Sequence, residues 1–136
     1  MPPDVTGSGS PAEWIRYAEA DLELATSASP PSGFYEPLCF HAQQAVEKAL
    51  KAILVKHGIE FPYTHNVQRL LDLLPAELTR TELVDRAGRV TAYAVSARYP
   101  SIDEPVTEEE YREALKISGA VVEWAKTQLA EADPSN

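Results

Sequence analysis

Three histidines and their polar neighbours are the side chains of this sequence best suited to acid–base chemistry or to binding an anion. His65 lies between Thr64 and Asn66 at the expected start of a helix, where free backbone amides favour negative groups. It can orient its loop by a hydrogen bond to the backbone, or it can help to hold an anion. His57 precedes Gly58, and we interpret it as a hydrogen-bond donor or cation near a helix end.

A second group contains His41, Gln44 and Lys48. Intervals of three and four residues bring side chains to the same side of a helix, so these three are expected to lie together. An imidazole, an amide and an amine in one place can contact a nucleotide. The same pattern is also typical of a solvated helix face or of a subunit interface, and the sequence leaves these readings open.

Arg98 stands beside Tyr99 and Pro100, at the expected end of a helix. Its guanidinium can bind the last carbonyls of that helix or form a salt bridge. It can also project toward a phosphate or a carboxylate, which its planar fork of donors suits.

Several kinds of site are not predicted. The histidines have no pair at an interval of four that would hold a metal on one helix face, and no glycine-rich phosphate or dinucleotide motif occurs. The single cysteine, Cys39, falls on an apolar helix face and is expected to be a small buried hydrophobe. We therefore predict no metal, no cofactor and no catalytic residue of these types.

The pattern of apolar residues predicts an all-α protein, an antiparallel up-and-down bundle of four to five helices with short loops. Capping boxes mark two helix starts, one at Ser10 and Glu13 and the other at Thr107 and Glu110. The expected helices cover residues 11–27, 36–58, 67–74, 83–97 and 108–129.

The second of these helices carries two contrasting sides. On a helical wheel, Cys39, Ala42, Ala45, Val46, Ala49, Ala52 and Ile53 share one side, and His41, Gln43, Gln44, Glu47, Lys48 and Lys51 share the other. The alanines predict close approach by a neighbouring helix, with larger groups such as Trp14 or Trp124 completing the core.

Length and composition predict a single domain over residues 10–132 after a disordered tail at residues 1–9. The formal net charge of −9 for 136 residues argues against general binding to nucleic acid, and we expect no DNA partner. We see no signal peptide and no apolar run long enough for a membrane span, so we expect a cytoplasmic protein without a membrane partner. Local basic surfaces within residues 38–69 and 80–98 remain open to a nucleotide or RNA.

Four segments in order resemble the HEPN domain family: WIRYAEADLELA, FHAQQAVEKALKAIL, THNVQRLLDLL and ARYP. The resemblance covers roughly residues 12 to 130. It implies a four- or five-helix bundle that forms a homodimer and is often encoded beside a minimal nucleotidyltransferase. It also implies one of two branches, either toxin-type ribonucleases or non-catalytic members that bind nucleotides or partner proteins.

The ribonuclease branch of the family carries an arginine followed four to six residues later by a histidine. Arg98 fits the arginine best, but Ile102, Asp103 and Glu104 occupy the following positions, and no histidine comes after it. The resemblance therefore favours a non-catalytic member that binds a nucleotidyltransferase, a nucleotide or an RNA end through Arg98, Lys48 and His65. Two alternatives remain, namely a ribonuclease with a degenerate motif and a purely structural dimerisation module.

Overall fold

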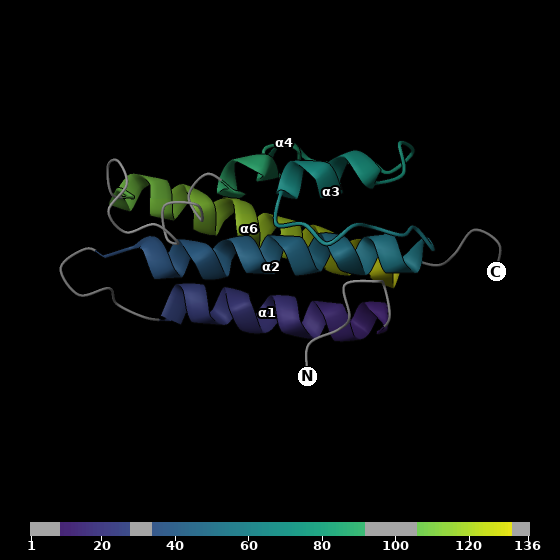
Figure 1. The fold of residues 1–136 in the computed structure, drawn as a ribbon, viewed down its shortest axis with the longest axis horizontal. Helices are drawn as coiled ribbons and strands as arrows, with labels where there is room; N and C mark the ends of the chain where they lie inside the picture. The colour runs from purple at the N-terminus through teal and green to yellow at the C-terminus, as the bar shows by residue number, and fades with distance from the viewer. Residues whose placement is uncertain (1–8, 28–33, 92–105, 132–136) are drawn as a thin grey trace.

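The computed structural model describes residues 9–27, 34–91 and 106–131, and these are helical with no strands. Three long helices dominate: α1 (Pro11–Ser27), α2 (Glu36–Lys56) and α6 (Glu108–Ala130). Figure 1 shows α1 running opposite to α2 and α6. The predicted all-α bundle is confirmed. The tail at residues 1–8 and Arg98 lie outside the described residues.

Local sequence signals begin and end these helices where they were expected. The Ser10 hydroxyl accepts a hydrogen bond from the Glu13 amide, and the Glu13 carboxylate accepts one from the Ser10 amide. These two bonds form the predicted capping box. Thr107 and Glu110 form the same box at the start of α6. After α2, Gly58 adopts a φ of 67°, a left-handed conformation that favours glycine and ends the helix.

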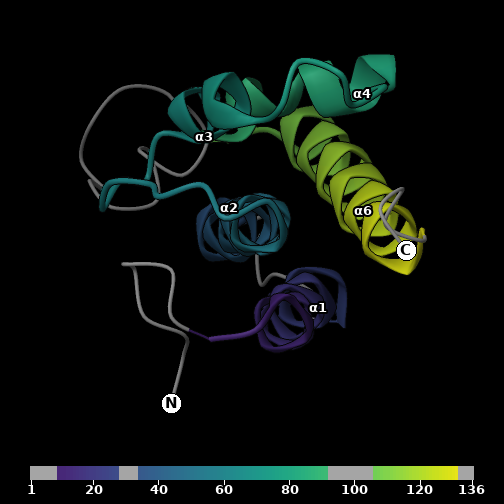
Figure 2. The ribbon, with the colours of Figure 1, turned by 90° about the vertical axis from the view of Figure 1, so that its right-hand side faces the viewer.

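Short helices form a layer over α2 and α6 (Figure 2). They are α3 (Val67–Leu73), α4 (Glu82–Asp85) and the 3₁₀ helix η2 (Ala87–Arg89). α3 packs on α2, and α4 packs on α6.

The prediction of one continuous helix from residue 83 was wrong within the described residues, because α4 ends at Asp85 and a 3₁₀ turn follows. Arg86 follows the last residue of α4, and the chain continues as η2, which packs on α3 and α6. A Cβ on Gly88 would lie 2.6 Å from Oε1 of Gln68, the terminal atom of a flexible side chain of α3, so η2 and α3 are in close contact here. The part of the expected helix from residue 92 to 97 lies outside the described residues.

α2 is the central helix of the core, and fourteen of its 21 residues are buried. Its alanines are completely buried, as the sequence pattern predicted, and α2 packs on α1, α6 and α3. Trp14 from α1 and Trp124 from α6 are also buried in this core. None of the helices in residues 9–27, 34–91 and 106–131 combines the length and apolar character that crossing a bilayer requires.

Gly119 lies in the middle of α6, where nothing in the described chain requires a glycine. A Cβ placed there would meet no atom within 4 Å. We therefore expect Gly119→Ala to raise the free energy of unfolding by about 1 kcal/mol, because alanine restricts the unfolded chain and favours the helix. Urea unfolding followed by circular dichroism measures this change, and an unchanged or lower stability would contradict it.

Candidate functional site

Four of the five predicted site residues lie in two hydrogen-bonded groups along α2, one around Asp21 and the other around Glu47. His41, Gln44 and Lys48 follow one another on the helix, and His65 reaches it from the segment between α2 and α3. We call these residues, with Asp21, Gln43 and Glu47, the polar arc. The fifth predicted residue, Arg98, lies outside the described residues, so the structure does not relate it to the arc.

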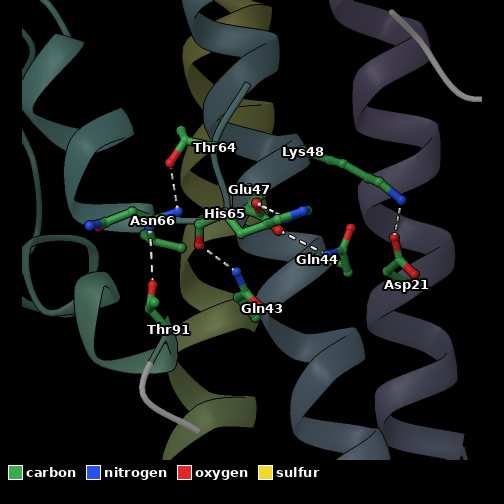
Figure 3. A network of polar contacts seen from close by, with 10 residues as sticks. Asp21, Gln43, Gln44, Glu47, Lys48, Thr64, His65, Asn66 and Thr91 are labelled. Carbon is green, nitrogen blue, oxygen red and sulfur yellow. Dashed lines mark hydrogen bonds and ion pairs between the residues drawn. The ribbon is translucent and has the colours of Figure 1, made fainter. Parts of the chain in front are cut away.

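Asp21 of α1 organises one end of the polar arc. Its carboxylate accepts a hydrogen bond from Nζ of Lys48 at 2.5 Å, which Figure 3 shows. The same carboxylate lies 3.2 Å from Nδ1 of His41. The Asp21 side chain is only 12 % exposed. The Lys48 ammonium also lies 5.8 Å from the centre of the Tyr17 ring. The amine that the sequence assigned to a ligand is thus already engaged by a carboxylate and an aromatic ring of its own chain.

Glu47 organises the other end, and its side chain is only 2 % exposed. Its two oxygens contact Nδ1 of His65 at 3.0 Å and Nε2 of Gln44 at 3.0 Å. Gln43 donates to the backbone carbonyl of His65 at 2.7 Å (Figure 3). The segment before α3 is therefore attached to α2 by both the ring and the backbone of His65.

The expected hydrogen bond from the His65 ring to the backbone was replaced by this contact with Glu47. Other groups orient the start of α3. The Asn66 side chain accepts a hydrogen bond from the Arg69 amide, and the Thr64 hydroxyl accepts one from the Asn66 amide. The Val67 amide donates to the Thr91 hydroxyl. With these amides in use, the start of α3 is a structural cap.

Lys51 extends the buried polar row of Gln43 and Glu47 by another helical turn. It is 6 % exposed, and Nζ lies 5.6 Å from the ring centres of both Trp14 and Phe61. Burial lowers the pKa of the Lys51 ammonium, and the Glu47 carboxylate partly opposes that shift. The sequence placed Gln43, Glu47 and Lys51 on the polar side of α2, but the structure buries all three. They are covered by α1 and by the segment before α3.

The comparisons with known proteins decide the family. A family model for the HEPN domain matches residues 11–128. The chain belongs to the HEPN domain family. The chain is also 30 % identical over 134 residues to the protein named "Putative toxin MJ1304" of Methanocaldococcus jannaschii, with 87 % of each chain covered.

Two solved structures share the HEPN fold of this chain. The crystal structure of TT1696 from Thermus thermophilus is 30 % identical, with a TM-score of 0.73 over 87 % of this chain and 97 % of that one. The crystal structure of ST0689, an archaeal HEPN homologue, is also 30 % identical, with a TM-score of 0.67 over 89 % of this chain and 98 % of that one.

The chemistry that this HEPN chain can perform at the polar arc follows from its charge balance. Asp21 faces Lys48 and His41, and Glu47 faces His65, so each carboxylate already has a basic partner. What the arc offers to another molecule is the half-buried amide of Gln44 and the partly exposed imidazoles. Such a surface donates and accepts hydrogen bonds without carrying a strong net charge.

Three residues of the polar arc were not predicted as site residues. Gln43 and Glu47 were assigned to the polar side of the second helix, whereas Asp21 was not singled out at all. Asp21 stands on the apolar stripe of α1 between Ala18 and Ala25, both of which are fully buried. A carboxylate on a buried stripe requires a partner, so its position was the available signal. Among the described residues, no group of three or more potential ligands is arranged to hold a metal.

Cys39 is fully buried, and burial raises the pKa of its thiol to about 12. Because the thiolate is the reactive form, we expect no reaction with a thiol-specific reagent at pH 8 while the chain is folded. Full titration of one thiol is expected after unfolding in guanidinium chloride. Rapid labelling of the native protein would contradict this burial.

Proposed function

We propose that this chain is a non-catalytic HEPN protein, a homodimer that binds a minimal nucleotidyltransferase in a module of toxin–antitoxin type. One observation carries the non-catalytic part, namely that no histidine follows Arg98 anywhere in the sequence. Asp103 stands at an interval where the family's ribonucleases have the imidazole. A carboxylate is ordinarily ionised near neutral pH, so it would repel the phosphate that it had to serve.

The charge balance of the polar arc supports a protein as the partner. A phosphate could pair with Lys48 only by competing with Asp21, which already accepts its ammonium at 2.5 Å. A protein surface can instead hydrogen-bond to Gln44 and the imidazoles and leave both internal ion pairs in place. The formal charge of −9 also disfavours polyanions as ligands.

Co-expression tests the partner directly. The chain is produced together with a minimal nucleotidyltransferase encoded beside it. Light scattering after size-exclusion chromatography measures the molar mass of the complex. We expect co-elution at a fixed ratio, with a dimer of this chain inside the complex. Absence of such a neighbouring gene, or separate elution of the two proteins, would contradict the proposal and favour a purely structural dimerisation module.

A specific observation favours nucleotide recognition as a second candidate function. Tyr63 is 69 % exposed and lies edge-on to the His65 ring, with 5.3 Å between the ring centres. An exposed ring beside the amide and imidazoles of the polar arc can stack on a base. Thermal stabilisation by AMP that is lost in Tyr63→Ala but kept in Phe34→Ala would support this function, since Phe34 is also strongly exposed. No stabilisation of the native chain would exclude it.

A further inference from the structure

A groove runs between α1 and α6, which lie side by side in Figure 2. Its volume is about 420 Å³, and it is lined by Glu19, Leu22, Glu23, Thr26, Leu115, Gly119, Val122 and Glu123. We call it the α1–α6 groove. Leu22, Leu115 and Val122 give it an apolar floor, while glutamates stand along its rim. None of the polar arc residues lines it, so it is a separate surface.

Gly119 is the part of the floor that the fold of the chain does not explain. At Gly88 a Cβ would meet the side chain of Gln68, whose Oε1 would lie 2.6 Å away. At Gly119 the corresponding space is open. A glycine weakens the interior of a helix, and an open face above it lets another backbone approach closely. The groove therefore has the form of a surface that accepts a segment from outside the described chain.

The rim of the groove has a single dominant charge. Glu19 and Glu123 flank Lys126, whose ammonium lies 3.1 Å from the first carboxylate and 3.5 Å from the second. The side chain of Glu23 has no ion-pair partner among the described residues. Three carboxylates against one amine leave the rim acidic, so it complements lysine and arginine side chains.

A second copy of this chain does not suit the groove. In a two-fold symmetric contact the same patch lies on both sides, so each acidic rim would face its own image. The floor lacks a buried polar side chain that could orient a small polar ligand, whereas it matches the apolar side of a helix.

We propose that the α1–α6 groove binds a basic amphipathic helix of the partner protein. Apolar side chains of that helix fill the space over Leu22, Leu115 and Val122, its backbone passes over Gly119, and its lysines or arginines meet Glu19, Glu23 and Glu123. This inference rests on the proposed function for the existence of a partner, and adds to the polar arc a second contact surface for that partner and its chemistry.

A labelled synthetic helix of about 18 residues, about five turns with leucine on one side and lysine on the other, is the probe. Fluorescence anisotropy measures its binding to the native chain and to variants. We expect Glu23→Lys and Gly119→Trp to weaken binding about tenfold or more, and Gly119→Ala to weaken it less while raising the unfolding midpoint. Glu77→Lys, which changes net charge equally at an exposed site away from the groove, is expected to weaken binding less than twofold, about 0.4 kcal/mol.

Equal losses in Glu23→Lys and Glu77→Lys would mean general attraction to an acidic protein, and would overturn the proposal. So would binding unaffected by Gly119→Trp, or no binding to the native chain. Helicity by circular dichroism verifies that Gly119→Trp is folded, which the open space predicts. If Gly119→Trp converts a dimer to a monomer in light scattering, the occupant is a second copy and the proposal is wrong.

The natural partner separates this inference from the proposed function. A nucleotidyltransferase that binds the native chain and not Gly119→Trp supports both. A nucleotidyltransferase that binds the native chain and Gly119→Trp equally supports the proposed function, but it shows that the groove is not the binding site. If no nucleotidyltransferase binds at all, the proposed function falls, and the peptide measurements still decide whether the groove accepts a basic helix.

Discussion

Replacing Glu47 by alanine is expected to lower the free energy of unfolding by about 3 kcal/mol, because a buried carboxylate with several partners is lost. The Glu47 side chain is 2 % exposed and accepts hydrogen bonds from His65 and Gln44. It is also the charge that opposes the lowered pKa of the buried Lys51. Alanine would leave that ammonium with less compensation. It would also remove the contact of the His65 ring with α2, while the Gln43 hydrogen bond to the His65 carbonyl remains.

Urea unfolding of Glu47→Ala measures this loss, with Glu60→Ala as the matched control. Glu60 is exposed in the neighbouring segment, so its removal is expected to change stability by less than about 0.5 kcal/mol. Because the folded chain releases the Lys51 proton at lower pH than the unfolded chain, stability of the variant should rise with pH toward 10.5, the ordinary lysine pKa. Equal stabilities of the two variants would contradict the structural role of Glu47.

Replacing Trp14 by alanine is expected to lower the free energy of unfolding by about 4 kcal/mol, since a large buried side chain leaves a cavity. Trp14 is 2 % exposed and meets the Phe61 ring edge-on, with 6.2 Å between ring centres. The Lys51 ammonium lies over the Trp14 ring. This side chain therefore joins the start of α1 to α2 and to the segment that follows it.

Trp14→Phe is the informative companion variant. The indole N–H of Trp14 is buried and has no hydrogen-bond partner among the described residues, so phenylalanine loses volume but none of the hydrogen bonds seen there. We expect it to cost about 1 to 2 kcal/mol, well below the alanine variant. Calorimetric or urea unfolding of both variants checks the order. A phenylalanine variant as unstable as the alanine variant would contradict the assigned packing.

The helix ends could be predicted from the sequence because their causes are local. Ser10 with Glu13, and Thr107 with Glu110, satisfy free amides within one turn, and Gly58 supplies the left-handed turn after α2. No distant part of the chain is needed for these contacts. The break after α4 could not be predicted in this way, since η2 packs on α3 and α6, and these contacts join distant parts of the sequence.

The candidate site could be predicted only in part. The spacing of His41, Gln44 and Lys48 places them on one side of a helix. In the structure His41 and Lys48 share Asp21, whereas Gln44 shares Glu47 with His65. Burial of Glu47 and Lys51 could not be derived from α2 alone, because it depends on which segments cover that side. The wheel pattern gives an angle around a helix but does not identify its neighbours.

Assay of RNA cleavage tests most directly the central claim that this chain recognises and does not cut. Purified native protein and Arg98→Ala are incubated with transfer RNA and messenger RNA, and the products are separated by electrophoresis. The missing imidazole after Arg98 predicts intact RNA with both proteins. Cleavage by the native protein that disappears in Arg98→Ala would contradict the claim and assign this chain to the ribonuclease branch.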